Sequence, residues 1–547
     1  MSHRNPRTLL ATHEVTNQAE PLEDVNLFTC DAILMSACAW SGAGTHADRL
    51  AAFGARVGAA ETQAWACQAN RVVPAFLPYD RFGRRIDEVE FHPAYHQLMR
   101  LGLEAGVSGA AWNVSQAGHA LHAGLLFLMG QADYGVCCPM SMTYAVVPAL
   151  RVEPAVAAEW EPRVTAETYD RRFAPASEKR AATMGMAMTE KQGGSDVRAN
   201  STRAQAQADG SYVLTGHKWF CSAPMSDAFL TLAYAPGGLT CFLVPRWRDG
   251  GELNEIEIQR LKDKLGDRSN ASSEIEYRGA SAVRVGDEGR GVRTIIEMVQ
   301  LTRLDCIVGS ATQMRQATAL AAWHADRRAA FQRKLIDQPL MRAVLADLAL
   351  DVEAAVALTF RLARALDRPD DPHEAAIARI GMPIAKYLVT KRAPTVVAEA
   401  MECLGGGGFV EDAPMARVFR QSPLNAIWEG SGNVIALDLL RALHREPDVR
   451  EALLSELREA ATGDSALSAM ATEAEQLVTA PIPEASARHA IERLALGLAA
   501  AALAKFGDPA VSDGFAARRL YGSSLTFGAG ERAIDETAII ARLALRA

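Results

Sequence analysis

The chain has 547 residues, of which 49% are hydrophobic and 22% are charged, and its formal net charge at pH 7 is −8. This length exceeds what a single compact core accommodates and predicts three or four domains. The composition is that of a globular protein and excludes disordered and collagen-like classes. The acidic balance gives no general reason to expect a nucleic acid or an anionic membrane as a partner.

The cysteines and the apolar segments bear on the compartment. Nine cysteines occur without a C-x-x-C pair, so we expect neither a disulfide framework nor a metal site, and a reducing compartment fits better. The N-terminal stretch MSHRNPRTLLATHEV lacks the long apolar core of a signal peptide. The longest run of apolar residues and glycine, Leu494 to Ala504, has eleven residues and is too short to span a bilayer. We therefore expect a cytoplasmic protein with no membrane partner.

The pattern of apolar residues changes along the chain. Residues 1–184 have mostly helical spacing and predict a helical N-terminal domain. Short, partly alternating segments such as SYVLTGHKWF then predict a β domain over 185–285. Helical spacing returns over 286–444, interrupted by the run LGGGGF, and residues 445–547 predict an extra helical domain. The expected fold class is α+β.

Two stretches of the predicted β domain could contact a flat ligand. The two glycines of MAMTEKQGGSDV (186–197) favour a tight turn, in which Thr189 and Ser195 could donate to a heteroaromatic ring or a phosphate. An ordinary turn between strands explains this string alone about equally well. In GHKWFCSAP (216–224), Trp219, Phe220 and Ser222 could form an aromatic wall beside a hydroxyl. An aromatic strand in a core is the commoner explanation of that pattern.

A third stretch, HADRRAAFQRKLIDQPL (324–340), carries two adjacent arginines. We expect Arg327 and Arg328 to precede Phe331 on a helix, with Gln338 in the next turn or loop. A guanidinium can hold a pyrophosphate through paired hydrogen bonds. Taken alone, the pattern favours a solvated basic helix face.

Two further stretches combine glycines with the start or end of a helical pattern. The four glycines of AEAMECLGGGGFVED (398–412) allow close approach to a phosphate-containing ligand, although a helix C-cap and turn explain them fully. In NAIWEGSGNV (425–434), Glu429 precedes a helical pattern, where helix dipoles commonly stabilise an acid. The small residues that follow leave space for a flat ligand, and Ser431 and Asn433 can hydrogen-bond to it.

These five stretches, in this order, resemble the signatures of the acyl-CoA dehydrogenase family of flavoproteins, over residues 90 to 443. The resemblance implies a helical N-terminal domain, a β-barrel-like middle domain and a C-terminal helical bundle, with FAD bound in a homotetramer. The cofactor-binding residues that it implies are Met188, Thr189, Gly194, Ser195, Phe220, Cys221, Ser222, Arg328, Gln338, Ile427, Ser431, Gly432 and Asn433. No metal is implied.

The resemblance also implies a catalytic base. Dehydrogenation of a thioester needs a base at the α-carbon and a hydride acceptor at the β-carbon, and by family likeness Glu429 is the base. Some relatives carry the base just before an arginine on an earlier helix, where this chain has Thr302. Glu429 is therefore the single candidate. Glu402 and Gln332 stand where many relatives have glutamine and glycine, which could alter the contact with the dinucleotide.

The chain is most similar to the members of this family that are associated with the response to DNA alkylation. The stretches GMAMTEKQGGSDV, RLKDKLGDRSNASSE and CPMSMTYA carry this likeness. It implies an extra C-terminal domain, a double-stranded DNA partner, and an acyl-CoA thioester or an alkylating small molecule as ligand. At most weak dehydrogenation of a branched acyl-CoA, such as isovaleryl-CoA, is implied. The candidates for DNA contact are Arg441, Arg518 and Arg519.

The charge of the C-terminal segment gives this DNA hypothesis little independent support. From Arg445 to the end, eleven Lys and Arg residues stand against fifteen Asp and Glu residues. Contacts to phosphate supply most of the non-specific affinity for DNA, so a local patch repeated in a tetramer would be needed. The alternatives are an ordinary short- or branched-chain acyl-CoA dehydrogenase without a DNA role, and an oxidase-like flavoenzyme that uses oxygen.

Overall fold

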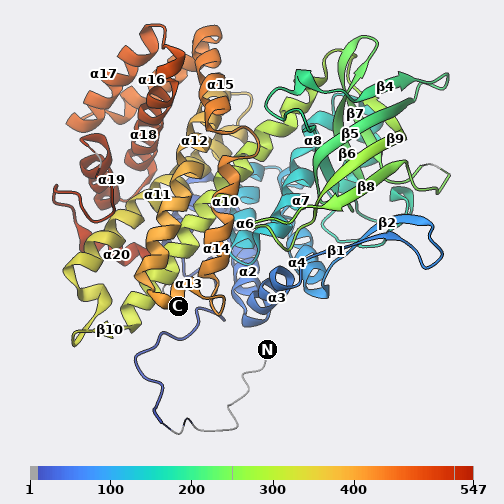
Figure 1. The fold of residues 1–547 in the computed structure, drawn as a ribbon. Helices are drawn as coiled ribbons and strands as arrows, with labels where there is room; N and C mark the ends of the chain where they lie inside the picture. Colours follow the sequence, from blue (N-terminus) through green and yellow to red (C-terminus); the bar gives the residue numbers. More distant parts are fainter. Residues whose placement is uncertain (1–9, 11, 249, 523, 546–547) are drawn as a thin grey trace. The chain divides into compact units, whose positions relative to one another are not determined.

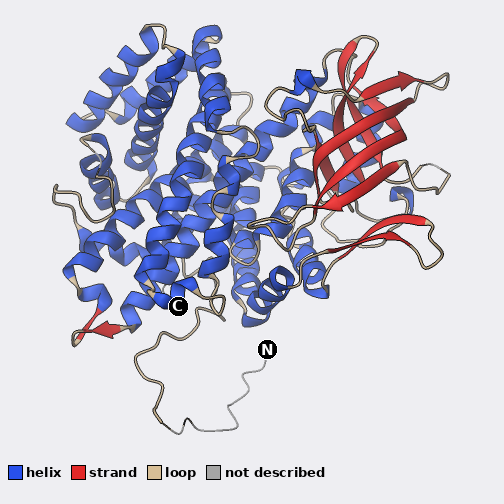
Figure 2. Cartoon of the chain, viewed as in Figure 1, coloured by secondary structure: helices blue, strands red, loops and turns tan. Residues whose placement is uncertain are grey.

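The computed structural model describes residues 10, 12–248, 250–522 and 524–545. The chain divides into two compact units. The helical unit comprises residues 1–64, 130–132 and 306–547, and the mixed unit comprises residues 65–129 and 133–305. Figure 2 shows that the longer strands belong to the mixed unit. Each unit is described in turn.

The first helices along the mixed unit surround a strongly apolar segment. The helices over residues 60–164 are α3 (Ala60–Arg71), α4 (Pro93–Glu104), α5 (Ala110–Asn113), α6 (Gly118–Gly130), α7 (Tyr134–Ala145), α8 (Val147–Leu150) and α9 (Pro154–Val164). Helices α6 and α7 are apolar on nearly every side and almost wholly buried, as expected for central helices. The Asp133 carboxylate caps α7 by accepting a hydrogen bond from the N–H of Val136 at 3.1 Å.

A β-hairpin interrupts the helices of this region, which the sequence predicts to be mostly helical. Strands β1 (Ala75–Tyr79) and β2 (Arg85–Glu90) pair antiparallel. The turn is fixed by Asp80, whose carboxylate accepts from the N–H groups of Phe82 and Arg84 at 2.8 and 3.0 Å. The sequence signal for β2 is weak, because most of its residues are charged and only two are apolar. Such a pattern is hard to distinguish from that of a polar loop.

The strands after residue 183 close into a small barrel (Figure 1). They are β3 (Met184–Ala187), β4 (Arg203–Ala206), β5 (Tyr212–Ser222), β6 (Ala228–Ala235), β7 (Gly238–Pro245), β8 (Ile256–Leu261) and β9 (Ser272–Val285). Strand β6 pairs with β7, β7 with β9, β9 with β5, β5 with β4, and β4 with β6. Strand β3 adds to β6 in parallel and β8 adds to β9. Closure leaves few free edges for pairing with other chains.

The helical unit is built around three long helices. Its elements are α1 (Ala32–Ser41), α2 (Ala47–Gly58), most of α10 (Gly291–Arg327), β10 (Ala329–Ala330), β11 (Arg333–Lys334), α11 (Pro339–Leu366), α12 (Pro372–Cys403), α13 (Gly406–Phe409), α14 (Met415–Gln421), α15 (Gly432–Arg445), α16 (Pro447–Ala460), α17 (Ser465–Thr479), α18 (Ala487–Phe506), α19 (Pro509–Phe515) and α20 (Glu536–Leu543). From Leu345 to Ala363 every residue of α11 is buried, so this helix forms the centre of the bundle.

The C-terminal helices pack onto this bundle. Helices α16, α18 and α20 contact α11 or α12. Buried ion pairs strengthen the attachment: Arg361 of α11 donates to Glu456 of α16 at 2.7 Å, and both side chains are at most 2% exposed. A buried guanidinium needs such a partner to offset its loss of hydration. Residues 445–547 are thus anchored to the helices before them.

No helix in the described part of the chain combines the length and apolar character that crossing a membrane requires. The same residues contain no group of three or more His, Cys, Asp or Glu side chains arranged to hold a metal ion.

Candidate functional site

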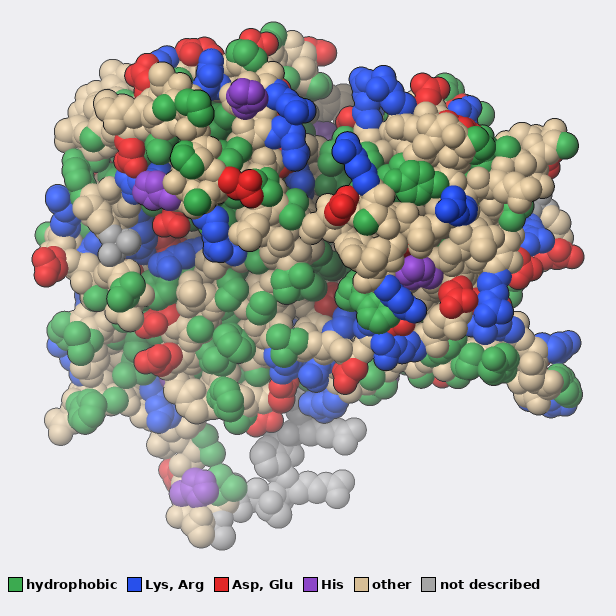
Figure 3. Space-filling model, turned by 45° about the horizontal axis from the view of Figure 1, so that its top comes forward, with side chains coloured by type: hydrophobic (Ala, Val, Ile, Leu, Met, Phe, Trp, Pro, Cys, Tyr) green, Lys and Arg blue, Asp and Glu red, His purple; other side chains and the backbone are tan. Residues whose placement is uncertain are grey.

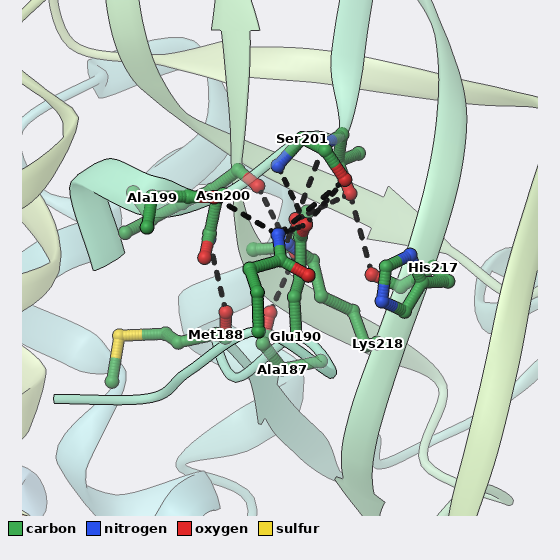
Figure 4. Close-up of polar contacts among 12 residues, drawn as sticks. Ala187, Met188, Glu190, Ala199, Asn200, Ser201, His217 and Lys218 are labelled. Carbon is green, nitrogen blue, oxygen red and sulfur yellow. Dashed lines mark hydrogen bonds and ion pairs between the residues drawn. The ribbon is translucent and has the colours of Figure 1, made fainter. Parts of the chain in front are cut away.

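A loop of the mixed unit, residues 188–196, follows β3 and is fixed by one buried carboxylate (Figure 4). Glu190 Oε2 accepts hydrogen bonds from the N–H and Oγ of Ser201, at 2.6 and 2.9 Å. Glu190 Oε1 accepts from Thr202 Oγ1 at 2.6 Å and from Lys218 Nζ at 2.8 Å. The side chains of Glu190 and Lys218 are fully buried. The loop is therefore held from inside the β domain.

Glu190 and Lys218 form a buried ion pair at 2.8 Å. Burial opposes the charge on Glu190, but the charge of Lys218 and the hydrogen bonds from Lys218, Thr202 and Ser201 outweigh it and lower the pKa of Glu190 to about 2. Burial lowers the pKa of Lys218, and Glu190 opposes that effect. Lys218 Nζ also donates to the carbonyl of Leu232 at 2.8 Å. The pair thus joins the loop to β5 and β6.

Sequence reasoning missed this pair, although a signal for it exists. Lys218 lies on β5 in phase with the buried residues Tyr212 and Leu214. A lysine on the inward phase of a strand requires a buried counter-charge. The first acid of the TEKQGGSD stretch, Glu190, is the residue that supplies it.

Two loop carbonyls accept hydrogen bonds from the β domain, and the two residues with hydroxyl groups are at least partly exposed. Trp219 N–H donates to the Thr189 carbonyl at 2.8 Å, and Asn200 Nδ2 donates to the Met188 carbonyl at 3.1 Å. The Thr189 side chain is half-buried and Ser195 is exposed. A Cβ on Gly194 would lie 2.6 Å from Thr189 Oγ1, so glycine is needed for Thr189 to keep its position.

The end of β5 lies beside this loop and presents alternate residues outward. Phe220 is 48% exposed, and Ser222 Oγ lies 3.1 Å from Ser272 Oγ. Cys221 is fully buried, and burial raises the pKa of its thiol to about 12. The proposed contact of Cys221 with the cofactor is therefore limited to its backbone. The reason is strand alternation, which turns Cys221 inward between two outward neighbours.

In the helical unit, Glu429 precedes α15 without capping it. The N-cap residue is Ser431, and Glu429 has a φ of +54°. A left-handed conformation costs a non-glycine residue about 1–2 kcal/mol. Such strain persists where the surrounding structure holds the backbone, and it is common at functional sites. The conformation of Glu429 thus argues against a simple capping role.

Lys386 of α12 holds the backbone on both sides of Glu429. Its ammonium donates to the carbonyls of Asn425, Trp428 and Gly430 at 3.0, 2.9 and 2.9 Å. Lys386 is 1% exposed. Three carbonyl acceptors match the three donors of an ammonium and offset part of its desolvation. Sequence reasoning missed Lys386, since nothing in its local helical pattern marks it.

The other predicted residues near Glu429 surround the same turn. Ile427 is 65% exposed, Ser431 is half-buried and Asn433 is exposed. A Cβ on Gly432 would lie 2.4 Å from Lys391 Cε, so this glycine permits the close approach of Lys391 from α12.

The arginine stretch differs from its expected conformation. Helix α10 ends at Arg327, so Phe331 does not lie on a helix but in the turn between β10 and β11, where it is 95% exposed with a φ of +51°. Arg328 Nη1 donates to the carbonyl of Asn17 at 3.0 Å, and Gln338 Nε2 donates to the carbonyl of Ala330 at 3.0 Å. The adjacent Gln332 is also left-handed, and the two residues together close a tight hairpin.

Two of the three arginines expected at a DNA surface are buried. Arg518 and Arg519 are 8% and 9% exposed, and Arg519 Nε donates to Asp351 of α11 at 2.9 Å. They lie on a π-helical turn that faces the bundle, so a phosphate cannot reach them without unfolding this segment. Their assignment to a DNA surface is wrong. The Arg441 side chain is 59% exposed on α15.

The structure thus forms two clusters of the predicted residues. One contains the 188–196 loop and the end of β5, in the mixed unit. The other contains residues 427–433 with Lys386 and Lys391, in the helical unit.

Three family models together match most of the chain. The model described as "Adaptive response protein AidB N-terminal domain" matches residues 17–171. The models for the middle and C-terminal domains of acyl-CoA dehydrogenase match residues 185–280 and 289–444. AidB of Escherichia coli (strain K12) is 47% identical over 448 residues, which cover 81% of this chain and 83% of AidB.

The chain belongs to the acyl-CoA dehydrogenase family. Acyl-CoA dehydrogenase family member 11 of Caenorhabditis elegans is 32% identical and covers 73% of this chain and 67% of its own length. The crystal structure of C. elegans ACDH-11 in complex with C11-CoA superposes with a TM-score of 0.83 at 28% identity, covering 94% of each chain. An acyl-CoA dehydrogenase from Bacillus anthracis, complexed with FAD, shares the fold with a TM-score of 0.62 at 17% identity. The expected fold class and family are confirmed.

FAD is the cofactor of this member of the family, and the residues present fit it. The hydroxyls of Thr189, Ser195 and Ser222 can donate to a flavin ring or a phosphate, and the exposed ring of Phe220 can cover an apolar face. At Gly405, Gly406 and Gly407 a Cβ would meet no atom within 4 Å. This open backbone suits a phosphate-containing ligand.

Proposed function

We propose that the chain is an FAD-dependent acyl-CoA dehydrogenase-type oxidoreductase of the AidB kind, with Glu429 as the base. The observation that carries this proposal is the backbone of Glu429, which is left-handed, lies outside α15, and is held by Lys386. A structural acid would not need that arrangement. The Glu429 carboxylate would take the proton from the α-carbon of an acyl-CoA thioester.

The chemistry balances with FAD as the second partner. When bound, FAD supplies the acceptor for the hydride that leaves the β-carbon, so that a Cα=Cβ double bond forms. The N–H of Glu429 could donate to the thioester carbonyl and stabilise the developing enolate. Support for a thioester substrate comes from the relative solved with C11-CoA.

The assembly and the setting are part of this proposal. We propose a homotetramer, in which the exposed hairpin carrying Arg328 and Phe331 reaches FAD of a neighbouring copy, and turnover that is weak with branched acyl-CoA. We also propose a cytoplasmic location. All nine cysteines are free, which suits a reducing compartment.

The test of this function is the bleaching of the flavin under anaerobic conditions. The holoprotein is mixed with a panel of straight and branched acyl-CoA thioesters, and the absorbance of the oxidised flavin is followed. Bleaching by at least one thioester would support the proposed dehydrogenase activity. Full retention of the oxidised spectrum with every thioester would contradict it.

We expect the purified protein to be yellow and to contain FAD that denaturation releases. Arg328→Ala should weaken the binding of FAD on the order of tenfold or more, because a charge-assisted contact to phosphate is lost. FAD dissociation is measured by fluorescence during dialysis. Arg327→Ala is the matched control, since its exposed neighbouring guanidinium lies over the Trp323 ring at 3.1 Å. Equal retention in both variants would remove Arg328 from the site.

A second function, binding of double-stranded DNA in protection from alkylation, is favoured by the 47% identity to AidB and by the match to the adaptive-response domain. Since Arg518 and Arg519 are buried, the DNA surface that we now propose is the outer face of α15, where Arg441 and Arg445 are exposed one turn apart. Figure 3 shows basic and acidic side chains intermixed on the face that it draws. Local convergence of arginines, rather than overall charge, would have to provide the affinity.

We expect duplex DNA to bind this surface with affinity that falls steeply as salt rises. Arg441→Ala combined with Arg445→Ala should reduce the slope of log K against log salt by about 2, because two phosphate contacts are lost. Fluorescence anisotropy of a short labelled duplex at several salt concentrations measures this slope. Arg203→Ala, at an exposed position of β4, serves as the control. No binding by the intact protein at low salt would remove the DNA function and leave an ordinary dehydrogenase.

A further inference from the structure

Two basic side chains of the helical unit converge on one buried tyrosine. Lys391 and Tyr387 lie one turn apart on α12, and Arg488 is the second residue of α18. Arg488 Nε donates to the Tyr387 hydroxyl at 3.1 Å, and Lys391 Nζ lies 5.6 Å from the centroid of the Tyr387 ring. Because Tyr387 is only 5% exposed, its ring holds the two cations near one another.

The start of α15 lies against the same lysine. A Cβ on Gly432, the first residue of this helix, would lie 2.4 Å from Lys391 Cε and 2.9 Å from Lys391 Nζ. The ammonium thus stands beside the positive end of the macrodipole of a 14-residue helix. The N-cap residue, Ser431, makes no side-chain hydrogen bond to the first turn. Since the first N–H groups of a helix have no partner within it, they add donors next to the two cations.

The two cations have no carboxylate partner within 4.0 Å among the described residues. Arg392 and Arg493, on the same two helices, each pair with an acid at 2.6 Å. The exposed Glu484 and Glu492 lie one turn before and after Arg488 in sequence, but neither pairs with it in the structure. The positive charge around the tyrosine is therefore not neutralised at short range by the described residues.

Lys391 and Arg488 repel each other at this position. Burial of Lys391 and, after it, the charge of Arg488 lower the pKa of the Lys391 ammonium. Like charges that are held close together are destabilising. An anion bound between the two side chains would offset this repulsion, so the arrangement favours a negatively charged ligand.

Both cations are accessible to a ligand. The Arg488 side chain is exposed, and Lys391 is half-buried. Arg488 uses its Nε on Tyr387, while its two terminal nitrogens donate to no described residue. The Lys391 ammonium also donates to no described residue, and its contact with Tyr387 is with the ring. Their remaining N–H donors can therefore reach an anion without any change in the protein.

Phosphate matches this set of donors. A phosphate monoester has a charge of about −2 and three strong acceptor oxygens. One such group can accept from an ammonium, a guanidinium and the N–H groups of a helix start together. A carboxylate has fewer oxygens and a single charge, and a neutral ligand would leave the repulsion between the cations in place.

We propose that Lys391, Arg488 and the first turn of α15 form a phosphate-binding site. Two sources supply this chemistry: the coenzyme A part of an acyl-CoA thioester, which rests on the function proposed above, and free inorganic phosphate. The acyl-CoA dehydrogenase C-terminal domain matches residues 289–444, so Arg488 lies outside it. The site thus gives the helices after residue 444 a role in binding a ligand.

Isothermal titration of the FAD-loaded protein with CoA, pantetheine and inorganic phosphate tests this proposal. CoA and pantetheine share the thiol end, but CoA alone carries phosphate groups. We expect Lys391→Met and Arg488→Gln each to weaken CoA about tenfold, because a charge-assisted hydrogen bond is lost, and to leave the heat from pantetheine unchanged. Arg368→Gln is the matched control, at an exposed arginine without an ion pair among the described residues, and should bind CoA as the wild type does.

The outcomes separate the two sources from each other and from the dehydrogenase function. Phosphate binding that weakens in both variants, with CoA binding unchanged, would keep the site and assign it to free phosphate. Equal affinities of the wild type and both variants for CoA and phosphate, or no binding of either by the wild type, would overturn the proposal. Release of FAD from the variants would assign the cations to the cofactor and overturn it as well. Because CoA carries no acyl group, cation-dependent CoA binding in a protein whose flavin no thioester bleaches would sustain this site alone.

Discussion

Glu429→Gln is expected to slow the reduction of the flavin by acyl-CoA by at least about a hundredfold, the scale typical of a general base. Glutamine keeps the size of the side chain and its ability to hydrogen-bond, but it cannot accept the proton from the α-carbon. The backbone should be preserved, because Lys386 donates to the carbonyls of Trp428 and Gly430, which the substitution leaves in place. FAD should therefore remain bound.

Single-turnover bleaching of the bound flavin measures this effect, because it separates the chemical step from the choice of electron acceptor. The thioester that bleaches the wild-type protein fastest is used for every variant. Glu451→Gln is the matched control, since that glutamate is 68% exposed on α16. A wild-type rate in Glu429→Gln would show that Glu429 has a structural role alone.

The sequence predicts much of the fold because local patterns coincide with burial. Strand β5 alternates between buried and more exposed positions at its two ends, which is the pattern that predicts a half-buried strand, and register shifts after Leu214 and Lys218 interrupt it. Strands β6 and β7 are buried at nearly every position, so only their β-branched and aromatic content and their short length indicate strands. The hairpin β1–β2 escaped prediction, because the charged residues of β2 give neither signal and β1 has only five residues, one of them a proline.

The sequence predicts the candidate site only where the residues of a motif also determine the local backbone conformation. The small residues around Glu429 indicate a tight turn, and the structure has one there, with Glu429 and Gly430 both left-handed. The residues that hold the turn and the loop, Lys386 and Glu190, act through contacts between distant segments. Sequence spacing does not encode such contacts, except where a charged residue falls on an inward strand phase.

The charge count of the C-terminal segment did not reveal that two of its arginines are buried, again because their contacts are made with distant segments. Composition treats each arginine as solvated, whereas Arg519 serves as a buried partner of Asp347 and Asp351. The acids of α11 that receive it are more than 160 residues away in sequence. Whether an arginine of residues 445–547 is free to contact phosphate or is paired with a carboxylate thus depends on tertiary packing, which the sequence of this segment does not reveal.

Glu190→Gln is expected to destabilise the protein by about 3–5 kcal/mol, because it leaves the buried ammonium of Lys218 without its counter-charge. The apparent melting temperature should fall by roughly 10 °C, given the size of the unit. FAD should also be retained less well, since Glu190 fixes the 188–196 loop through Ser201 and Thr202. Differential scanning fluorimetry at a fixed heating rate measures the shift, and the flavin signal gives the second readout.

The dependence of this effect on pH separates a lost ion pair from a simple packing defect. The pKa of Glu190 is about 2 in the folded protein, below the ordinary value of 4.5 for a glutamate. A carboxyl whose folded pKa is lowered contributes stability that is full above its unfolded pKa and is lost as pH falls towards the folded value. The difference in melting temperature between the wild type and Glu190→Gln should therefore be largest at pH 6–8 and shrink below about pH 4.5. Adding Lys218→Met should restore part of the stability at pH 7, because the uncompensated charge is then removed. A pH-independent difference, or no recovery in the double variant, would show that the pair contributes only through its volume.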